Sequence, residues 1–446
     1  MSIRLLFNKT VGYFTVILIL ALSNVSFSIP SFARQTNLPC SSCHYVYPEL
    51  TPFGRLFKLN AYTLTGIATI QSTNTQEETT LKILNFLPIS AMIQSSYNKV
   101  NKDVTGTQND VVEFPQQFSL FVAGEISPYF GSFIQITYDD QGGSFALDNT
   151  DLRFANHTTI ANKDLLYGIT LNNGPTVEDV WNTTSAWGFP YVSSAVAPTP
   201  TAATLIDGGL AGNVTGLGVY SLYNNLVYGQ VSFYRSTPQG GPFPADANSE
   251  NTIKGISPYW RVALQKQWSN QYVEVGTYGL SSNLYPTGIS GLTDNYTDIG
   301  FDAQYEANLG SGTLLAHSTL ITEKAKLNST FDAGGSSLAT NKLNSFKIDC
   351  SYNFKMGYAF TLGYFSTTGD ANPLLYPDDP VDGSLNGDPL SNGLMAQVTY
   401  LPWLNTQFSL QYVFYNKFNG GSTNYDGAGR NASDNNTLYL VGWVVF

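Results

Sequence analysis

The stretch from Gln407 to Tyr415 reads Q-F-S-L-Q-Y-V-F-Y, and its side chains alternate in polarity. Phe408, Leu410, Tyr412 and Phe414 fall on one face, and Gln407, Ser409 and Gln411 on the other. Successive side chains of a β-strand point to opposite faces, so a period of two predicts a strand. The same alternation recurs in Ile89 to Ser96 and in Val227 to Phe233. Strands that are apolar outside and polar inside are typical of an outer-membrane barrel with a wet lumen.

Short and long connections alternate between the predicted strands, as they do in outer-membrane barrels. We expect tight turns near Ser127-Pro128, His157 to Asn162, Tyr223 to Asn225, Trp268 to Asn270, Leu309 to Gly312, Asn353 to Met356 and Pro402 to Asn405. Long segments rich in Gly, Asn, Asp, Pro, Ser and Thr cover 99–112, 140–148, 174–209, 237–255, 282–296, 324–341, 368–390 and 418–434.

The pattern predicts a mainly β fold, a transmembrane antiparallel barrel of about sixteen strands. An even number of strands places both barrel ends on the same side, which we expect to be the periplasm. The last segment, Asn436 to Phe446, again alternates and ends on an aromatic residue, which resembles an outer-membrane assembly signal. A soluble β-sandwich is the alternative, but it needs neither the alternating loop lengths nor the terminal aromatic strand.

The first residues combine Arg4 and Lys9 with an apolar run from Val11 to Leu22, which predicts a secretory signal peptide over 1–33, cleaved near 28 or 33. The run is short for a membrane-spanning helix. A formal net charge of -11 argues against nucleic-acid binding, which needs a concentrated basic surface. The prediction is therefore of an exported protein without a nucleic-acid partner.

Near the N-terminus, the motif C-S-S-C-H places Cys40, Cys43 and His44 at the spacing that attaches one haem c covalently. Two thiols meet the vinyl groups, and the adjacent imidazole turns to the iron as an axial ligand. A redox dithiol usually accompanies a βαβ pattern, and a zinc site needs a second ligand pair; neither follows here. We expect a monohaem cytochrome c segment over 34–80, plugging a barrel over 81–446.

The residues after the motif supply candidates for the rest of the haem pocket. Thr51 and Pro52 are suited to begin a short helix. Phe53 and Phe57 on one face of that helix are candidates for packing on the porphyrin, together with Leu56. Arg34, Arg55 and Lys58 are candidate partners of the haem propionates, although each also suits a solvated surface position. So short a segment needs the barrel to complete the pocket.

The second axial ligand, which sets the potential, has few candidates in the sequence. Met92 lies on the predicted luminal face of the first strand, and His157 at the periplasmic end of the fourth. Met356 falls in a short turn, and His317 and Met395 lie higher in the barrel. Met92 and His157 rank first, and lining of the lumen is the alternative role for each.

Two further features bear on function. Acidic pairs at Asp139-Asp140, Glu178-Asp179 and Asp378-Asp379 lie in or next to predicted outer loops, where their oxygens would suit a hard cation, although solvated loop residues are the simpler interpretation. Cys350 lies in a predicted strand as a small buried or lipid-facing thiol.

The block Ser31 to His44, S-F-A-R-Q-T-N-L-P-C-S-S-C-H, continues into P-E-L-T-P-F-G-R-L-F-K-L-N-A-Y-T-L-T-G. It resembles the fused monohaem cytochrome-porins of the bacterial outer membrane, of which the Fe(II)-oxidising cytochromes are best known. The segment Asn172 to Trp181, followed by W-G-F-P at 187–190, is also similar to a loop of that family.

The resemblance implies an iron-oxidising oxidoreductase activity in the outer membrane of a Gram-negative-type bacterium. Electrons from extracellular Fe(II), or another extracellular donor, would pass through the haem to a periplasmic cytochrome or other carrier. A diffusion porin with a structural or sensory haem plug is one alternative. Electron export to extracellular acceptors is another.

Overall fold

The computed structural model describes residues 30–65, 87–139 and 143–446. Most of the predicted signal peptide lies outside these residues, as does the predicted boundary between the haem segment and the barrel near residue 80. The strands are β1 Ile89–Val100, β2 Val111–Ser127, β3 Phe130–Asp139, β4 Ser144–Ile160, β5 Lys163–Asn172, β6 Val214–Tyr223, β7 Val227–Ser236, β8 Glu250–Ile253, β9 Ser257–Trp268, β10 Gln271–Thr287, β11 Asp294–Asn308, β12 Gly312–Lys326, β13 Thr340–Phe354, β14 Tyr358–Gly369, β15 Ser391–Trp403, β16 Thr406–Lys417 and β17 Thr437–Val445.

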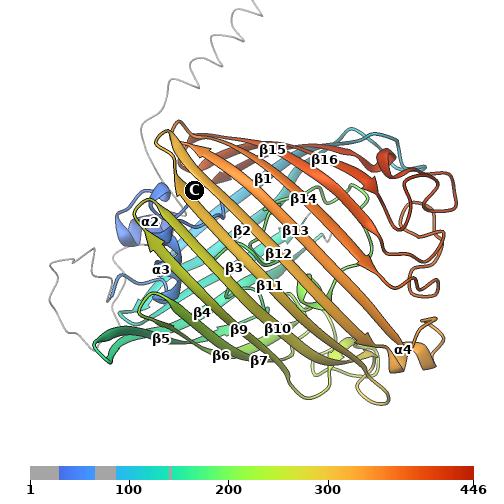
Figure 1. Cartoon of the computed structure of the whole chain (residues 1–446), viewed down its shortest axis with the longest axis horizontal. Coiled ribbons are helices and arrows are strands. Elements are labelled where there is room, and N and C mark those ends of the chain that lie inside the picture. Colours follow the sequence, from blue (N-terminus) through green and yellow to red (C-terminus); the bar gives the residue numbers. More distant parts are fainter. Residues whose placement is uncertain (1–29, 66–86, 140–142) are drawn as a thin grey trace, which may run out of the picture.

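These strands form one closed antiparallel barrel (Figure 1). Except at the short β8, each strand pairs with the next one along the chain, and β1 pairs with both β2 and β17, which closes the ring. The short β8 and the longer β9 both pair with β10, so together they occupy one position of the ring. The predicted barrel of sixteen strand positions is therefore confirmed.

The two faces of the barrel differ as the alternation predicted. On β7, Val231 and Phe233 are exposed on the outer face, while Gln230 and Ser232 are buried in the lumen. Cys350 of β13 is also exposed on the outside, which agrees with a lipid-facing thiol. A closed barrel with an apolar outer surface satisfies every strand edge and matches the lipid of an outer membrane.

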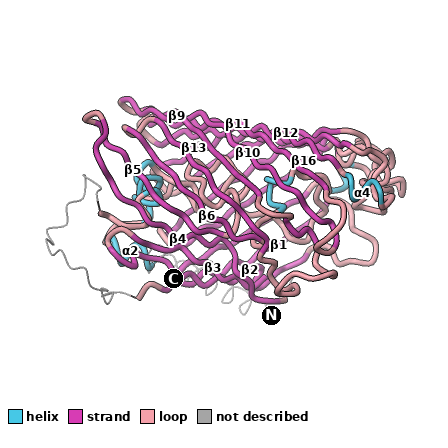
Figure 2. The backbone as a smooth tube through the Cα atoms, turned by 90° about the horizontal axis from the view of Figure 1, so that it is seen from below, coloured by secondary structure: helices cyan, strands magenta, loops and turns pink. Residues whose placement is uncertain are grey.

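The seven predicted tight turns lie at one end of the barrel, and the longer connections lie at the other. Figure 2 shows these longer loops gathered at the end opposite α2. Two of the predicted long connections, 140–148 and 282–296, are shorter than expected. Strand β4 already begins at Ser144. Strand β10 continues to Thr287, and β11 begins at Asp294. Their polar residues continue the strands beyond the apolar band, so composition alone misplaced the strand ends.

The remaining elements are α2 Pro30–Thr36, η1 Cys40–Ser42, α3 Pro52–Leu59, η2 Leu205–Gly209, α4 Asn328–Asp332 and η3 Ala432–Asn435. No helix among the described residues is long and apolar enough to cross a membrane. Helices α2 and α3 lie at the short-turn end, where the C-terminus also lies (Figure 1). The motif and the chain end therefore share one side of the barrel, as expected from an even number of strands.

Candidate haem-binding site

The motif Cys40-Ser-Ser-Cys43-His44 folds as one tight turn. The amides of Cys43 and His44 donate to the carbonyl of Cys40 over 2.9 and 2.8 Å. The Cys40 thiol lies 2.7 Å from the carbonyl of Leu404, in the turn between β15 and β16. The motif is thus fixed to the short-turn end of the barrel.

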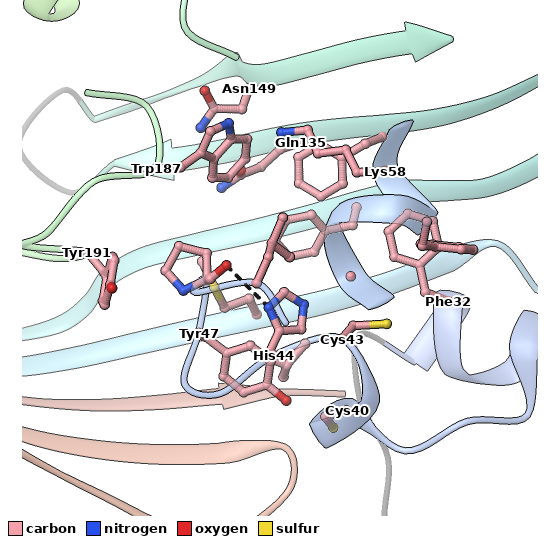
Figure 3. Close-up of a pocket in the computed structure, with 18 of the residues that line it drawn as sticks. Phe32, Cys40, Cys43, His44, Tyr47, Lys58, Gln135, Asn149, Trp187 and Tyr191 are labelled. Atoms are coloured by element: carbon pink, nitrogen blue, oxygen red, sulfur yellow. Dashed lines mark hydrogen bonds between the residues drawn. The ribbon is translucent and has the colours of Figure 1, made fainter. Parts of the chain in front are cut away.

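The imidazole of His44 has the orientation and charge state that iron ligation needs. Its Nδ1 lies 3.3 Å from the carbonyl of Pro48, which can only accept a hydrogen bond, so Nδ1 carries the proton and Nε2 keeps its lone pair (Figure 3). Burial lowers the pKa of His44 to about 4, against smaller raising effects of the Pro48 and Glu49 backbone. A neutral imidazole with its second nitrogen bonded to a carbonyl is the usual form of a metal-ligating histidine.

Helix α3 packs directly on the motif. Thr51 caps the helix by accepting a 3.1 Å hydrogen bond from the Gly54 amide, and Pro52 occupies the first turn, as the sequence predicted. Gly54 lies so close to the carbonyl of Cys43 that a Cβ there would collide with it. The helix thereby turns Phe57 into the cavity beside the motif, while Phe53 stacks on Phe57 with ring centroids 6.3 Å apart.

A large cavity, here called the haem cavity, lies between the motif and the barrel wall. Its open space, including the solvent at its mouth, is about 1420 Å³. Cys40, Cys43 and His44 all line it. Nine aromatic residues contribute to the other walls: Phe32, Tyr47, Phe57, Tyr62, Phe121, Phe133, Trp187, Tyr191 and Trp443.

Of the two leading candidates for the second axial ligand, only Met92 lines this cavity. Its side chain is 3% exposed and faces the lumen from β1, among Phe57, Phe121 and Phe133. Gln94 is its polar neighbour, with Nε2 3.8 Å from the sulfur. Met92 therefore shares one enclosure with the haem motif.

The other candidates lie elsewhere. His157 is bonded through Nδ1 to Asp164 at 3.0 Å and through Nε2 to the amide oxygen of Asn60 at 3.0 Å, outside the cavity lining. His317 pairs with Asp349 in the lumen, and Met356 is exposed in its short turn. Met395 packs with Phe189 in a separate cluster. The placement favours Met92 over all of them.

The three cations proposed for the propionates are also separated by the fold. Arg34 donates to the carbonyls of Leu87 and Ile89, and Arg55 forms a buried ion pair with Glu306 of β11. Only Lys58 lines the cavity; its Nζ donates to the carbonyls of Val177 and Asp179, each over 2.8 Å. Burial, and next the charge of Arg153, lower the pKa of Lys58 to about 7.

Residues 173–213, between β5 and β6, form the part of the site that the sequence did not predict. This segment, here called the inner loop, turns into the lumen instead of standing outside. Glu178 and Asp179 are buried, and Asp179 pairs with Arg261 of β9 at 3.0 Å. The interpretation of this acidic pair as solvated loop residues was therefore wrong.

The inner loop reaches down to the N-terminal segment. The Asn182 amide oxygen accepts a hydrogen bond from the Leu50 amide over 2.9 Å, and the Tyr191 hydroxyl donates to Glu49 over 3.0 Å. Trp187, Tyr191 and Asn182 line the haem cavity. The aromatic W-G-F-P block was the available signal for this role, because Trp and Phe are unusual in a solvated loop.

The cavity fits a covalently attached haem. Two thiols and a neutral imidazole lie on one side, a thioether lies on the barrel wall, and aromatic side chains form much of the remaining lining. No group of three or more His, Cys, Asp or Glu residues suited to a bare metal ion occurs among the described residues.

No family model matches the chain, and no curated protein matches it. Among solved structures, it is similar to an anion-selective porin from Comamonas acidovorans, with 14% identity over 80% of this chain and 98% of that one, at a TM-score of 0.48. It is also similar to OmpF from Salmonella typhi in complex with daunomycin, with 14% identity, 80% and 97% coverage and a TM-score of 0.45. The barrel itself is established by the strand pairing of this chain.

Proposed function

We propose that this chain is a fused outer-membrane monohaem cytochrome-porin, which passes electrons from extracellular Fe(II) through one haem c to a periplasmic carrier. The observation that carries the proposal is the enclosure of Cys40, Cys43, His44 and Met92 in a single cavity inside the short-turn end of the barrel. Diffusion porins need no such constellation.

Four residues would hold the haem c. Cys40 and Cys43 would form the thioether bonds, His44 would bind the iron through Nε2, and Met92 would supply the second axial ligand. Bound haem c supplies a one-electron redox centre. A methionine opposite a histidine raises the potential of such a centre, which favours accepting electrons over exporting them.

The position in the barrel supports the inward direction. With both barrel ends at the short-turn side in the periplasm, the long loops face outward. The inner loop lies in the lumen and contacts the N-terminal segment, for example where Lys58 donates to the Val177 carbonyl. Fe(II) would then be oxidised without Fe(III) entering the cell. An inner loop that occupies part of the lumen gives less support to the alternative of a diffusion porin.

The test is a spectrum of the purified protein before and after anaerobic addition of Fe(II). We expect a reduced c-type haem band in the wild-type protein, with one haem per chain. Cys40→Ser combined with Cys43→Ser should remove covalent haem on a denaturing gel while leaving a folded barrel. Haem that stays oxidised in excess Fe(II) would contradict the proposed donor, and absence of covalent haem would contradict the whole assignment.

A further inference from the structure

A second cavity adjoins the haem cavity on the side of the long loops. Its open space is about 1100 Å³, and it lies between β2–β4 and the base of the inner loop, lined by Gln116, Thr137, Ser144, Ala146 and Asn173 among others. The two cavities share Gln117, Asp148 and Asn149 as lining residues. These three residues, here called the neck, thus stand between the two cavities.

The second cavity reaches the outer end of the barrel. Ser144 is the first residue of β4, at the long-loop end, and Ser144, Ala146 and Ala211 are exposed. The neck lies deeper, because Asp148 and Asn149 are half-buried farther along β4. Asn149 and Gln135 lie beside Trp187 on the wall of the haem cavity (Figure 3).

Asp148 is the acidic group of the neck; burial raises its pKa, against the lowering effect of hydrogen bonds from Thr137 and the Asn149 backbone. Among the described residues, it is the one carboxylate that lines either cavity. Its oxygens accept from the Thr137 hydroxyl at 3.0 Å and from the Asn149 amide at 2.8 Å, and no described Lys or Arg forms an ion pair with it. Four neutral side-chain amides also line the haem cavity, those of Gln94, Gln117, Gln135 and Asn149. The cation in its lining, Lys58, donates to the carbonyls of Val177 and Asp179.

We propose that these two cavities form the access route for a small hydrated dication from the outside to the haem edge, and that Asp148 selects for positive charge at the neck. The assignment of the dication as Fe(II) rests on the proposed function. An uncompensated carboxylate in a cleft with low-dielectric walls raises the local concentration of cations. Neutral amides and hydroxyls can replace part of the contact with solvent without holding a hydrated ion tightly. Asp148 acts here as a specificity residue.

Thiol labelling tests the route independently of haem chemistry. In a Cys350→Ser background of the holoprotein, Asn149→Cys places a reporter at the neck and Ser144→Cys places a control at the mouth. Reagents are cationic and anionic methanethiosulfonates of similar small size, added from the long-loop side of vesicles. We expect position 149 to react roughly three- to tenfold faster with the cationic reagent, the low end of rate effects in charged clefts.

Asp148→Asn should remove this preference, and Asp148→Glu should retain it. Reaction at position 144 but not at 149 would overturn the route, and a preference that survives Asp148→Asn would overturn the role of Asp148.

In a second experiment, Asp148→Asn should slow haem reduction by Fe(II) about three- to tenfold and leave reduction by an uncharged hydroquinone unchanged. If Asp148→Asn slows haem reduction by Fe(II) and by the hydroquinone equally, charge selection by Asp148 is contradicted. A wild-type haem that Fe(II) does not reduce would refute the proposed function, while the labelling result would still decide the route.

Discussion

Met92 is the residue whose replacement should change the proposed redox centre most directly. Met92→Ala removes the thioether from the cavity, so we expect loss of the methionine-ligated spectrum and a potential lowered by on the order of 0.1 V. The measurement is a spectroelectrochemical titration of the purified protein.

His157→Gln is the matched control for Met92, because His157 lies at the same end of the barrel but bonds to Asn60 and Asp164. Its spectrum and potential should match the wild type. If His157→Gln changes the axial spectrum and Met92→Ala does not, the ligand assignment is reversed.

Glu178 should make the stability of the protein fall as the pH rises. Burial raises its pKa to about 7, opposed by Arg153 and by hydrogen bonds from Ser232 and Asn172. The folded state therefore binds more protons than the unfolded state between about pH 4.5 and 7. The contribution of protonated Glu178 to the free energy of unfolding is complete below about pH 4.5 and is lost as the pH rises through about 7. In the Glu178→Gln variant, the free energy of unfolding should change less between pH 4.5 and 8, by at most about 3 kcal/mol.

Urea unfolding in detergent micelles at several pH values measures this effect. Glu250→Gln, on an exposed residue of β8, is the control and should leave the slope unchanged. A Glu178→Gln protein with the wild-type slope would show that Glu178 is not the titrating group.

At the scale of single residues, the sequence predicted the haem motif and the face of each strand, but not the contacts between residues far apart in the chain. The order of Cys40, Cys43 and His44 can be read directly, and strand alternation placed Met92 in the lumen. The partners of Arg55 and His157, however, are Glu306 and Asn60, which lie 251 and 97 residues away in the sequence. Whether a side chain faces a cofactor or an ion pair at such separation depends on the assembled barrel.

Helix α3 depends on a close backbone approach at Gly54. A methyl group there would collide with the carbonyl of Cys43, so Gly54→Ala should push the helix from the motif at a cost of about 1–3 kcal/mol. We expect less covalent haem per chain, measured by haem staining against total protein. Gly229→Ala in β7 is the control, because its nearest added contact is 4.0 Å away at Ser221. Equal haem loading in the two variants would contradict the packing argument.

Among the elements, the strands were predictable and the inner loop was not. A strand between lipid and lumen must alternate, and Gln407 to Tyr415 shows that pattern without knowledge of its neighbours. A loop rich in polar residues satisfies its backbone equally well outside or inside a polar lumen. The inward path of 173–213 is stabilised by partners such as Arg261 with Asp179, and these contacts exist only once the barrel has closed.

For the whole molecule, the inner loop inside the lumen predicts a lower ion conductance than that of an open barrel. Open barrels of sixteen strands leave an aqueous channel, so replacing residues 177–206 with a short Gly/Ser linker should raise single-channel conductance roughly twofold or more. Planar-bilayer recordings provide the measurement. Deletion of the exposed residues 105–107 is the control and should have no effect. An unchanged conductance after removal of the inner loop would mean that the N-terminal segment alone blocks the pore.

The haem cavity takes its walls from both ends of the chain. Phe32 precedes the motif, Met92 belongs to the first strand, and Val445 is the last residue of the last strand. The motif is synthesised first, whereas the enclosure is complete only when the final strand has paired with β1. A haem attached to the exported precursor would thus remain uncovered until barrel closure, so shielding of the cofactor reports that assembly has reached its final residue.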